Sequence, residues 1–239
     1  MGDAEAADRR IAFFGGSFDP PHMGHLAVAR AARSALCLDK VLFAPVGAQP
    51  LKPQGASASF DDRVAMTRLA LAGEPGFEVS LADAPKSSGE PNYTLTTLQT
   101  LLAEIGPEGA LFCLMGADAF AGLKSWHGAA ELPFVAPLIV ASRPGLLAGG
   151  LREGLPKGLT LEVDENADAD GPEGSLRIGQ LRNAAGVSAP FYLLPGVHVD
   201  VSASEIRRQV QAARGDLTEG GELLPAAVAE YIRDHGLYC

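Results

Sequence analysis

The sequence predicts an α/β fold in which a mainly parallel sheet is flanked by helices. Short apolar runs of the kind found in buried strands alternate with helix-like runs along the chain. The chain has 239 residues, of which 47% are apolar, so it can bury the core of one large domain or of two small ones. The sequence shows no fixed-period repeat, which leaves this alternation as the main guide to the architecture.

The runs expected to form strands are Ile11–Phe14, Val41–Pro45, Phe77–Ser80, Leu111–Met115, Leu138–Ala141 and Phe191–Leu194. The runs expected to form helices are Leu26–Leu36, Phe60–Leu71, Thr96–Ile105, Ala119–Trp126, Ala203–Arg214 and Pro225–His235. In such a sheet, ligands bind beyond the carboxyl ends of the parallel strands. Polar motifs that follow a strand or open a helix are therefore the candidate site residues.

We expect a single domain over residues 11–239, preceded by a flexible N-terminal tail at 1–10. Organisation weakens between about 146 and 183, where acidic residues cluster from Glu162 to Glu173. This stretch is expected to be a variable acidic surface insertion; metal binding is the alternative, but no recognisable loop spacing supports it. In the run from Phe60 to Leu71, the arginines are expected to be exposed on a packing helix.

The stretch from Ile11 to Leu26 combines a strand, a glycine turn and the start of a helix. Gly15 and Gly16 let the backbone turn sharply where the strand ends. Asp19-Pro20-Pro21 belongs to a loop, because its prolines neither continue a strand nor fit a helix interior. The unit presents free backbone N–H groups and the positive end of a helix at one point, which suits an anion.

Two histidines, His22 and His25, open that helix with Gly24 between them. Positions three apart share a helix face, so both imidazoles are expected beside the glycine turn. Imidazole donates hydrogen bonds and can carry positive charge near neutral pH, which suits a triphosphate whose charge rises as a bond breaks. A metal-binding pair and two ordinary surface histidines are the simpler alternatives.

Further polar residues follow the next strands. Lys52 lies in a proline-rich loop and could place a cation over phosphates or remain a solvated loop lysine. Asn92-Tyr93-Thr94 precedes a helix that its threonines can cap. Arg143 ends the strand at Leu138–Ala141 and either faces the cleft or forms a structural salt bridge.

Two motifs near helix starts complete the set of candidates. Gly116 permits a close backbone approach at a strand end, Asp118 could accept from ribose hydroxyls, and Trp126 offers a flat aromatic face. Taken singly, Asp118 could equally cap a helix and Trp126 could be a core residue. The stretch from Val201 to Arg207 fits a capping box with a hydrophobic staple. Arg207 lies one turn into the helix, where it can reach a phosphate with a forked pair of donors.

These motifs together resemble a known family. Gly-Gly-Ser-Phe-Asp-Pro-Pro-His-Met-Gly-His at 15–25 is similar to the His-x-Gly-His signature of the nucleotidylyltransferase superfamily. Within it, the chain most resembles bacterial nicotinate-nucleotide adenylyltransferases. Supporting stretches are the Asn-Tyr-Thr at 92–94, the Gly-x-Asp-x-x-x-x-Leu-x-x-Trp at 116–126, the strand ending in Arg-Pro-Gly at 143–145 and the Val-Ser-Ala-Ser-Glu-Ile-Arg at 201–207.

The resemblance implies a Rossmann-like, doubly wound sheet and adenylyl transfer from ATP to nicotinate mononucleotide in NAD biosynthesis. The residues that it implies for catalysis are His22, His25 and Arg207. The residues that it implies for ATP binding are Gly15, Gly16, Ser17, Phe18, His22, His25, Lys52, Ser202, Ser204 and Arg207. The residues that it implies for acceptor binding are Tyr93, Thr94, Gly116, Asp118, Trp126 and Arg143. The chain departs from the family pattern at Leu51, where a histidine is common, and mildly at Ala203 and Ser204.

Composition limits the partners and the compartment. A net charge of −10 argues against broad nucleic-acid binding, and no apolar run reaches the ~18 residues of a membrane span. Without a signal peptide pattern, and with three widely spaced cysteines that fit no zinc or redox motif, we expect a cytoplasmic protein with free thiols. Mg²⁺ is expected to be carried with ATP rather than held in a protein cage. Self-association into a homo-oligomer is left open.

Two other functions remain compatible with the motifs. A sibling adenylyltransferase would use nicotinamide mononucleotide or phosphopantetheine as the acceptor, with the choice resting on Tyr93, Thr94 and Trp126. A nucleotide-binding regulator without catalysis is supported only by Leu51, whereas His22, His25 and Arg207 count against it.

Overall fold

This computed structural model describes residues 10–49, 55–142, 148–163, 176–194, 196–197, 201–212 and 223–239. In these residues, eight strands form one sheet with the order β3-β2-β1-β4-β5-β8-β7-β6. The strands from β3 to β8 in that order pair in parallel, whereas β7 and β6 are added antiparallel. The strands are β1 (Arg10–Gly16), β2 (Lys40–Pro45), β3 (Phe77–Val79), β4 (Ala110–Gly116), β5 (Leu138–Ala141), β6 (Leu159–Val163), β7 (Arg177–Asn183) and β8 (Ser188–Leu194).

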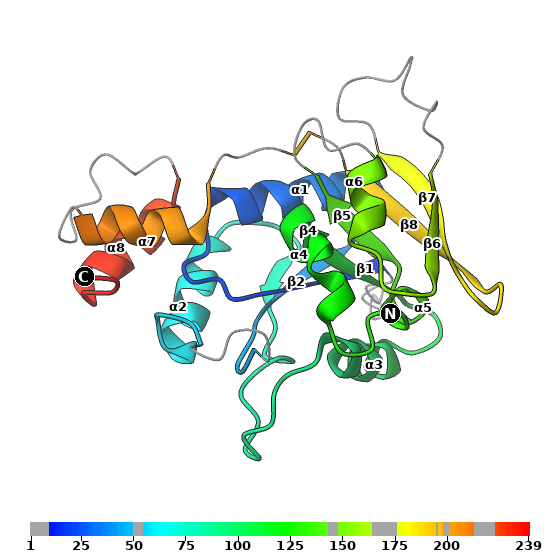
Figure 1. Cartoon of the computed structure of the whole chain (residues 1–239). Coiled ribbons are helices and arrows are strands. Elements are labelled where there is room, and N and C mark those ends of the chain that lie inside the picture. The colour runs from blue at the N-terminus through cyan, green and yellow to red at the C-terminus, as the bar shows by residue number, and fades with distance from the viewer. Residues whose placement is uncertain are drawn as a thin grey trace, which may run out of the picture.

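Helices cover both faces of the parallel part of the sheet (Figure 1). The described helices are α1 (Met23–Leu36), α2 (Phe60–Ala70), α3 (Thr94–Ile105), α4 (Ala117–Ala121), α5 (Leu132–Val135), α6 (Ala148–Glu153), α7 (Ala203–Ala212) and α8 (Ala226–Asp234), with a 3₁₀ turn at Leu123–Ser125. None of these helices is long and apolar enough to cross a membrane.

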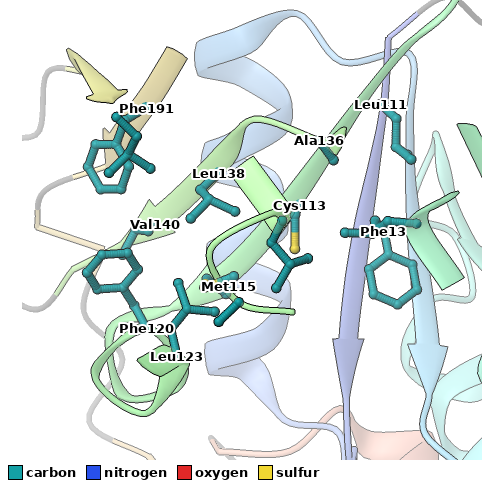
Figure 2. Packing of buried hydrophobic residues seen from close by; sticks show 14 of the residues in the cluster. Phe13, Leu111, Cys113, Met115, Phe120, Leu123, Ala136, Leu138, Val140 and Phe191 are labelled. Carbon is teal, nitrogen blue, oxygen red and sulfur yellow. The ribbon is translucent and has the colours of Figure 1, made fainter. Parts of the chain in front are cut away.

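The apolar core is divided between the two faces because the central strands are apolar on both sides, as parallel strands between helices require. On one face, Phe13, Cys113 and Val140 meet side chains of α3 to α6 (Figure 2). On the other face, alternate residues of the same strands, such as Phe14 and Leu114, pack against the buried stripe of α1. Burial of this kind contributes about 25 cal/mol for each Å² of apolar surface removed from water.

A third apolar cluster joins helices that lie far apart in the sequence. Met66 of α2 packs with Ile206 of α7 and with Val228 and Ile232 of α8. Figure 1 shows α7 and α8 at one end of the molecule and β6 and β7 at the other. A backbone hydrogen bond from the N–H of Met23 to the carbonyl of Leu223, 2.9 Å long, ties the same end to the start of α1. The C-terminal helices are thereby held beside the loop that joins β1 to α1, the signature loop (residues 17–22).

The predicted α/β class with a mainly parallel sheet is confirmed, and every expected strand is present. Two strands were not predicted: β6 and β7 lie inside the range 146–183 that the sequence assigned to a surface insertion. Each buries only alternate residues on one face, so neither shows a continuous apolar run. The N-terminal boundary also shifts, because Arg10 begins β1 and donates through Nε to the carbonyl of Leu36 at 3.0 Å.

The arginines of α2 were expected to be exposed, and this is wrong for Arg63. Arg68 is exposed, but Arg63 is buried and donates to the carbonyl of Ser17 at 2.7 Å and to that of Val46 at 2.8 Å. These two carbonyls belong to the loops that follow β1 and β2. Arg63 therefore ties together the loops at the carboxyl ends of two neighbouring strands.

Replacing Arg63 by Met should lower the free energy of unfolding by roughly 2–4 kcal/mol, because one buried and one partly buried carbonyl lose charged donors. Arg68→Met is the matched control, and it should stay within about 0.5 kcal/mol of the wild type because the side chain is exposed. Urea unfolding of both variants measures the difference. Equal losses in the two variants would show that Arg63 is not a structural tie.

Candidate active site

The candidate site lies where the strand order reverses. The chain runs from β1 outward through β2 to β3 and then returns to β4 on the other side of β1. Phe13 pairs with Cys113, so Gly16 and Gly116 lie equally far beyond the pair, at the carboxyl ends of adjacent strands. In doubly wound sheets the loops diverge at this point and leave a crevice for a ligand.

The two signature histidines stack on each other at the start of α1. His22 is the N-cap residue in an extended conformation, and His25 is the third residue of the helix. Their ring centroids are 3.7 Å apart, and the backbone N–H of His22 donates to Nδ1 of His25 at 3.1 Å. Phe18 meets the His25 ring edge-on with a centroid distance of 4.9 Å, so the second imidazole rests on an aromatic support.

Burial makes both imidazoles neutral at pH 7. Desolvation lowers the pKa of His22 to about 4. Desolvation, with a smaller contribution from His22, lowers the pKa of His25 well below its usual 6.5. The positive charge expected near neutral pH is therefore not supported, because the apolar surroundings disfavour the charged form. Neutral imidazoles can still form hydrogen bonds with a ligand.

The hydrogen bonds also assign the tautomer of His25. Its Nδ1 accepts from the backbone of His22, so we assign the ring proton to Nε2, which makes that atom a donor. The Nδ1 atom of His22 is buried, and no described residue forms a hydrogen bond with it. As far as the structure describes the chain, the site thus offers one fixed donor and one buried ring nitrogen without a protein partner.

The glycine between the histidines is required by the packing of His22. A Cβ atom at Gly24 would lie 3.0 Å from Nδ1 of His22 and 3.1 Å from a methyl group of Val201. Both distances are shorter than ordinary van der Waals contacts, so any larger residue would displace the His22 ring or Val201, which precedes α7. A glycine at position 24 therefore reflects close packing between the start of α1 and Val201 in the C-terminal part of the chain.

Arg207 lies against the signature loop. Its predicted role in one anion site with His22 and His25 requires this position. Its Nη1 donates to the backbone carbonyl of Asp19 at 2.7 Å, and its Nη2 donates to Oγ of Ser204 at 3.2 Å. Ser202 caps α7 by accepting from the N–H of Glu205 at 3.2 Å, which is half of the predicted capping box. The side chain of Arg207 keeps 29% exposure, so it is open to a ligand.

The loop residue Asp19 is a buried hydrogen-bonding centre that the sequence analysis placed only in a loop. Its carboxylate accepts from the N–H of Ser57 at 2.6 Å, from the N–H of Ala58 at 3.0 Å and from the hydroxyl of Tyr238 at 2.8 Å. No sequence pattern marks a carboxylate whose partners come from such distant segments. Tyr238, near the end of the chain, thereby contacts the signature loop.

A second group of predicted residues lies at the start of α3. Tyr93 is the N-cap residue, Thr94 begins the helix, and no side chain caps the first turn within the described residues. The expected threonine cap is therefore absent, and the Thr97 hydroxyl instead donates to Asp83. The ring of Tyr93 contacts the ring of the exposed His127 in a tilted arrangement, with centroids 4.4 Å apart, a contact that the sequence did not predict.

Asn92 connects this second group to the loop after β2. Its Oδ1 accepts from the N–H of Ala48 at 3.1 Å, and its Nδ2 donates to the carbonyl of Ala84 at 3.0 Å. The next residue of that loop, Gln49, donates through Nε2 to Oγ of Ser17 at 3.1 Å. A continuous set of hydrogen bonds thus links the start of α3 to the signature loop.

The motif at 116–126 surrounds the start of α4. Gly116 is the N-cap residue, and a Cβ atom built on it would meet no protein atom within 4 Å. Asp118 is exposed in the first turn, and Trp126 is half-buried and packs against the core cluster of Phe13. Trp126 directly precedes His127 and so lies near Tyr93. Two predicted site residues, Lys52 and Arg143, lie outside the described residues. The same holds for Leu51, where the sequence departs from the family pattern.

Within the described residues, no three His, Cys, Asp or Glu side chains converge as a metal site would require. Among these residues, the histidine pair has no additional ligand of those types with which to hold a metal. Its stacked geometry and its place at a helix N-terminus are instead suited to an oxyanion.

Comparison with known proteins defines the class of this chain. Residues 13–209 match the sequence model of the cytidylyltransferase-like family, and the chain belongs to that family. It is 39% identical over 230 residues to a probable nicotinate-nucleotide adenylyltransferase from Gloeobacter violaceus, a match that covers 96% of each chain. It is 41% identical over 232 residues to the protein of the same name from Laribacter hongkongensis, covering 95% of this chain and 94% of that one. The predicted resemblance to nicotinate-nucleotide adenylyltransferases is thereby confirmed.

Solved structures confirm the fold. The nicotinic acid mononucleotide adenylyltransferase of Plasmodium falciparum, complexed with NaAD, matches with a TM-score of 0.67 at 17% identity, covering 96% of this chain and 97% of that one. A putative nicotinate-nucleotide adenylyltransferase from Vibrio parahaemolyticus matches with a TM-score of 0.54 at 16% identity, covering 93% and 97%. At these identities the likeness concerns the Rossmann-like architecture alone.

Acidification should destabilise the protein through His22. Its folded pKa of about 4 lies below the ordinary 6.5, so the unfolded chain binds a proton in this window that the folded chain does not. The stabilising effect of a neutral His22 is complete above pH 6.5 and is lost as the pH falls toward 4, by about 3 kcal/mol. Urea unfolding between pH 7 and 4.5 measures this slope.

His22→Asn is the matched variant, since asparagine is favoured at an N-cap position but does not titrate. Its stability should fall less steeply with pH than that of the wild type, with His25 responsible for part of the slope that remains. An unchanged slope in this variant would contradict the buried, neutral state assigned to His22.

Proposed function

We propose that this protein transfers the adenylyl group of ATP to nicotinate mononucleotide, giving nicotinate adenine dinucleotide and pyrophosphate. The observation that carries the proposal is the hydrogen bond from Arg207 to the carbonyl of Asp19, which joins motifs 188 residues apart. It brings Arg207 of α7 to the end of the signature loop where α1 begins, which is where His22 and His25 lie. Names of relatives along the full chain support the acceptor.

In the proposed step, a phosphate oxygen of nicotinate mononucleotide attacks the α-phosphorus of ATP. The bond from that phosphorus to the bridging oxygen of the β-phosphate breaks, and pyrophosphate leaves with the electron pair. The attacking group is already an anion, so the step needs no protein base and no covalent intermediate. Positioning and stabilisation of the developing charge are what the protein has to supply.

The phosphate side of the site would use donors from both ends of the chain. The Nε2–H of His25, with His22 beside it, would donate to the α-phosphate and to the departing oxygen. Arg207 and Ser204, with Lys52, would hold the β- and γ-phosphates, and Ser202 would fix the start of α7. Gly15 to Phe18 would let the backbone pass close to the nucleotide.

The acceptor side would lie between the starts of α3 and α4. The first turn of α3 has no side-chain cap at Tyr93, so its free N–H groups would favour the carboxylate of nicotinate over the neutral amide of nicotinamide. Thr94 and Trp126 would hold the ring. Gly116 would leave room for the nucleotide, while Asp118 and Arg143 would contact the ribose and its surroundings.

Magnesium is proposed to arrive bound to the phosphates of ATP, where it would neutralise part of their charge. The proposed compartment is the cytoplasm, which agrees with the three free cysteines, Cys37, Cys113 and Cys239. Self-association is not part of the proposal.

The proposal is tested by pyrophosphate release with magnesium-ATP and three acceptors in parallel: nicotinate mononucleotide, nicotinamide mononucleotide and phosphopantetheine. We expect rapid release with the nicotinate compound and slow release with the other two. Preferred use of another acceptor would point to a sibling transferase. ATP binding without release from any acceptor would point to a nucleotide-binding regulator.

His25→Ala should lower kcat roughly 100-fold, because it removes a donor whose effect is greatest in the transition state. The KM for nicotinate mononucleotide should change little, since the acceptor pocket lies at α3 and α4. His235→Ala is the control: that exposed histidine stacks on Tyr231 in α8 and lies outside the proposed site. Equal losses in kcat and acceptor binding would contradict the role assigned to His25.

Gly116→Ala separates ligand space from protein packing. A Cβ atom here meets no protein atom within 4 Å, so the thermal unfolding midpoint should stay within about 2 °C of the wild type. If the nucleotide occupies that space, the KM for substrate should rise several-fold. A drop in the unfolding midpoint without any kinetic change would place the requirement for glycine in the fold.

A further inference from the structure

The carboxylate of Asp19 collects donors from three parts of the chain. Oδ2 accepts from the N–H of Ser57, while Oδ1 accepts from the N–H of Ala58 and from the hydroxyl of Tyr238. Asp19 is only 4% exposed, so water has little access to replace a missing donor. Full pairing is what a buried carboxylate needs, because an oxygen left without a donor in buried surroundings costs free energy.

Arg207 is held next to this carboxylate but is not hydrogen-bonded to it. Its Nη1 lies 3.8 Å from Oδ2 of Asp19, whereas the same nitrogen donates at 2.7 Å to the backbone carbonyl of Asp19. A guanidinium hydrogen-bonded directly to a carboxylate forms a much stronger contact than one bonded to a carbonyl. Such a contact would compete with any phosphate for the same guanidinium.

We propose that Tyr238 is a positioning residue for the triphosphate site, because its hydroxyl satisfies Asp19 and so leaves Arg207 available to the phosphates of ATP. This inference rests on the proposed role of Arg207 as a phosphate ligand. Without the tyrosine hydroxyl, Oδ1 would keep one donor, and Arg207 would move onto the carboxylate. ATP would then have to break that contact before binding.

The surroundings of Tyr238 fix its hydroxyl in this role. Its ring packs against the third apolar cluster, and the N–H of the preceding Leu237 donates to the carbonyl of Ile232 at 3.0 Å. Burial, together with the negative charge of Asp19, raises the pKa of the phenol, so the group is protonated and acts as a donor. Its φ of 65° lies in the left-handed region, a conformation that surrounding contacts must hold in a residue other than glycine.

The test is the affinity of Tyr238→Phe for a non-hydrolysable ATP analogue, measured by calorimetry, with the KM values for ATP and acceptor measured alongside. The dissociation constant of the analogue and the KM for ATP should rise about 3- to 10-fold, as expected when one charge-assisted contact competes with binding. The acceptor KM should change less than twofold. A merely structural role would not move one substrate constant without the other.

Tyr231→Phe is the matched control. The hydroxyl of Tyr231 also donates to a carboxylate, Asp62, at 3.0 Å, but without contact to the signature loop. This variant loses the same kind of hydrogen bond from the same end of the chain and should bind the analogue like the wild type. Equal weakening in both variants, or none in Tyr238→Phe, would overturn the proposal.

A double-mutant cycle with Arg207→Ala identifies the route of the effect. In the Arg207→Ala background there is no guanidinium to trap, so Tyr238→Phe should cause no further loss of affinity for the analogue. The same loss in both backgrounds would show that Tyr238 does not act through Arg207. Analogue binding needs no acceptor, so this cycle decides the role of Tyr238 even if nicotinate mononucleotide proves not to be a substrate.

Discussion

The parallel pairing of β1 with β4 is the constraint on which the rest of the site depends. It places the carboxyl ends of two strands next to each other although their outgoing loops lead to opposite sides of the sheet. The signature loop and α1 follow β1, and Gly116 with α4 follows β4. Because both loops leave from one edge, donors for phosphate and the space above Gly116 come together without any long-range adjustment.

The histidine pair shows how such a site can serve an anion without carrying charge of its own. Stacking at 3.7 Å would place two cations in contact if both rings were protonated, and burial already disfavours the charged form. A neutral donor such as His25, held by the helix start and by Phe18, is preorganised, so it needs no rearrangement as charge develops on a phosphate. The positive charge is left to Arg207, at the edge of the site.

Much of this arrangement could be predicted from the sequence, and the exceptions have physical causes. Strands that are buried on both faces appear in the sequence as continuous apolar runs. For this reason β1 and β4 were predicted, whereas the half-exposed β6 and β7 were missed. The glycine turn, the histidine spacing and the cap at Ser202 are local patterns, so their places could also be predicted. Arg63 and Asp19 could not be interpreted correctly, because their partners come from distant segments and burial of a charged residue has no local signature.

The hydrogen bonds of the signature loop also have a consequence for the order in which the molecule is completed during synthesis. Asp19 accepts from Tyr238, 219 residues later, and its carbonyl accepts from Arg207. The sheet as far as β8 can form while the chain is still emerging from the ribosome, since its strands all precede residue 195. The proposed phosphate-binding half of the site must wait for α7 and the last few residues. A nascent chain would therefore carry a folded sheet for some time before it could bind ATP. Nucleotide binding could then stabilise only the finished protein.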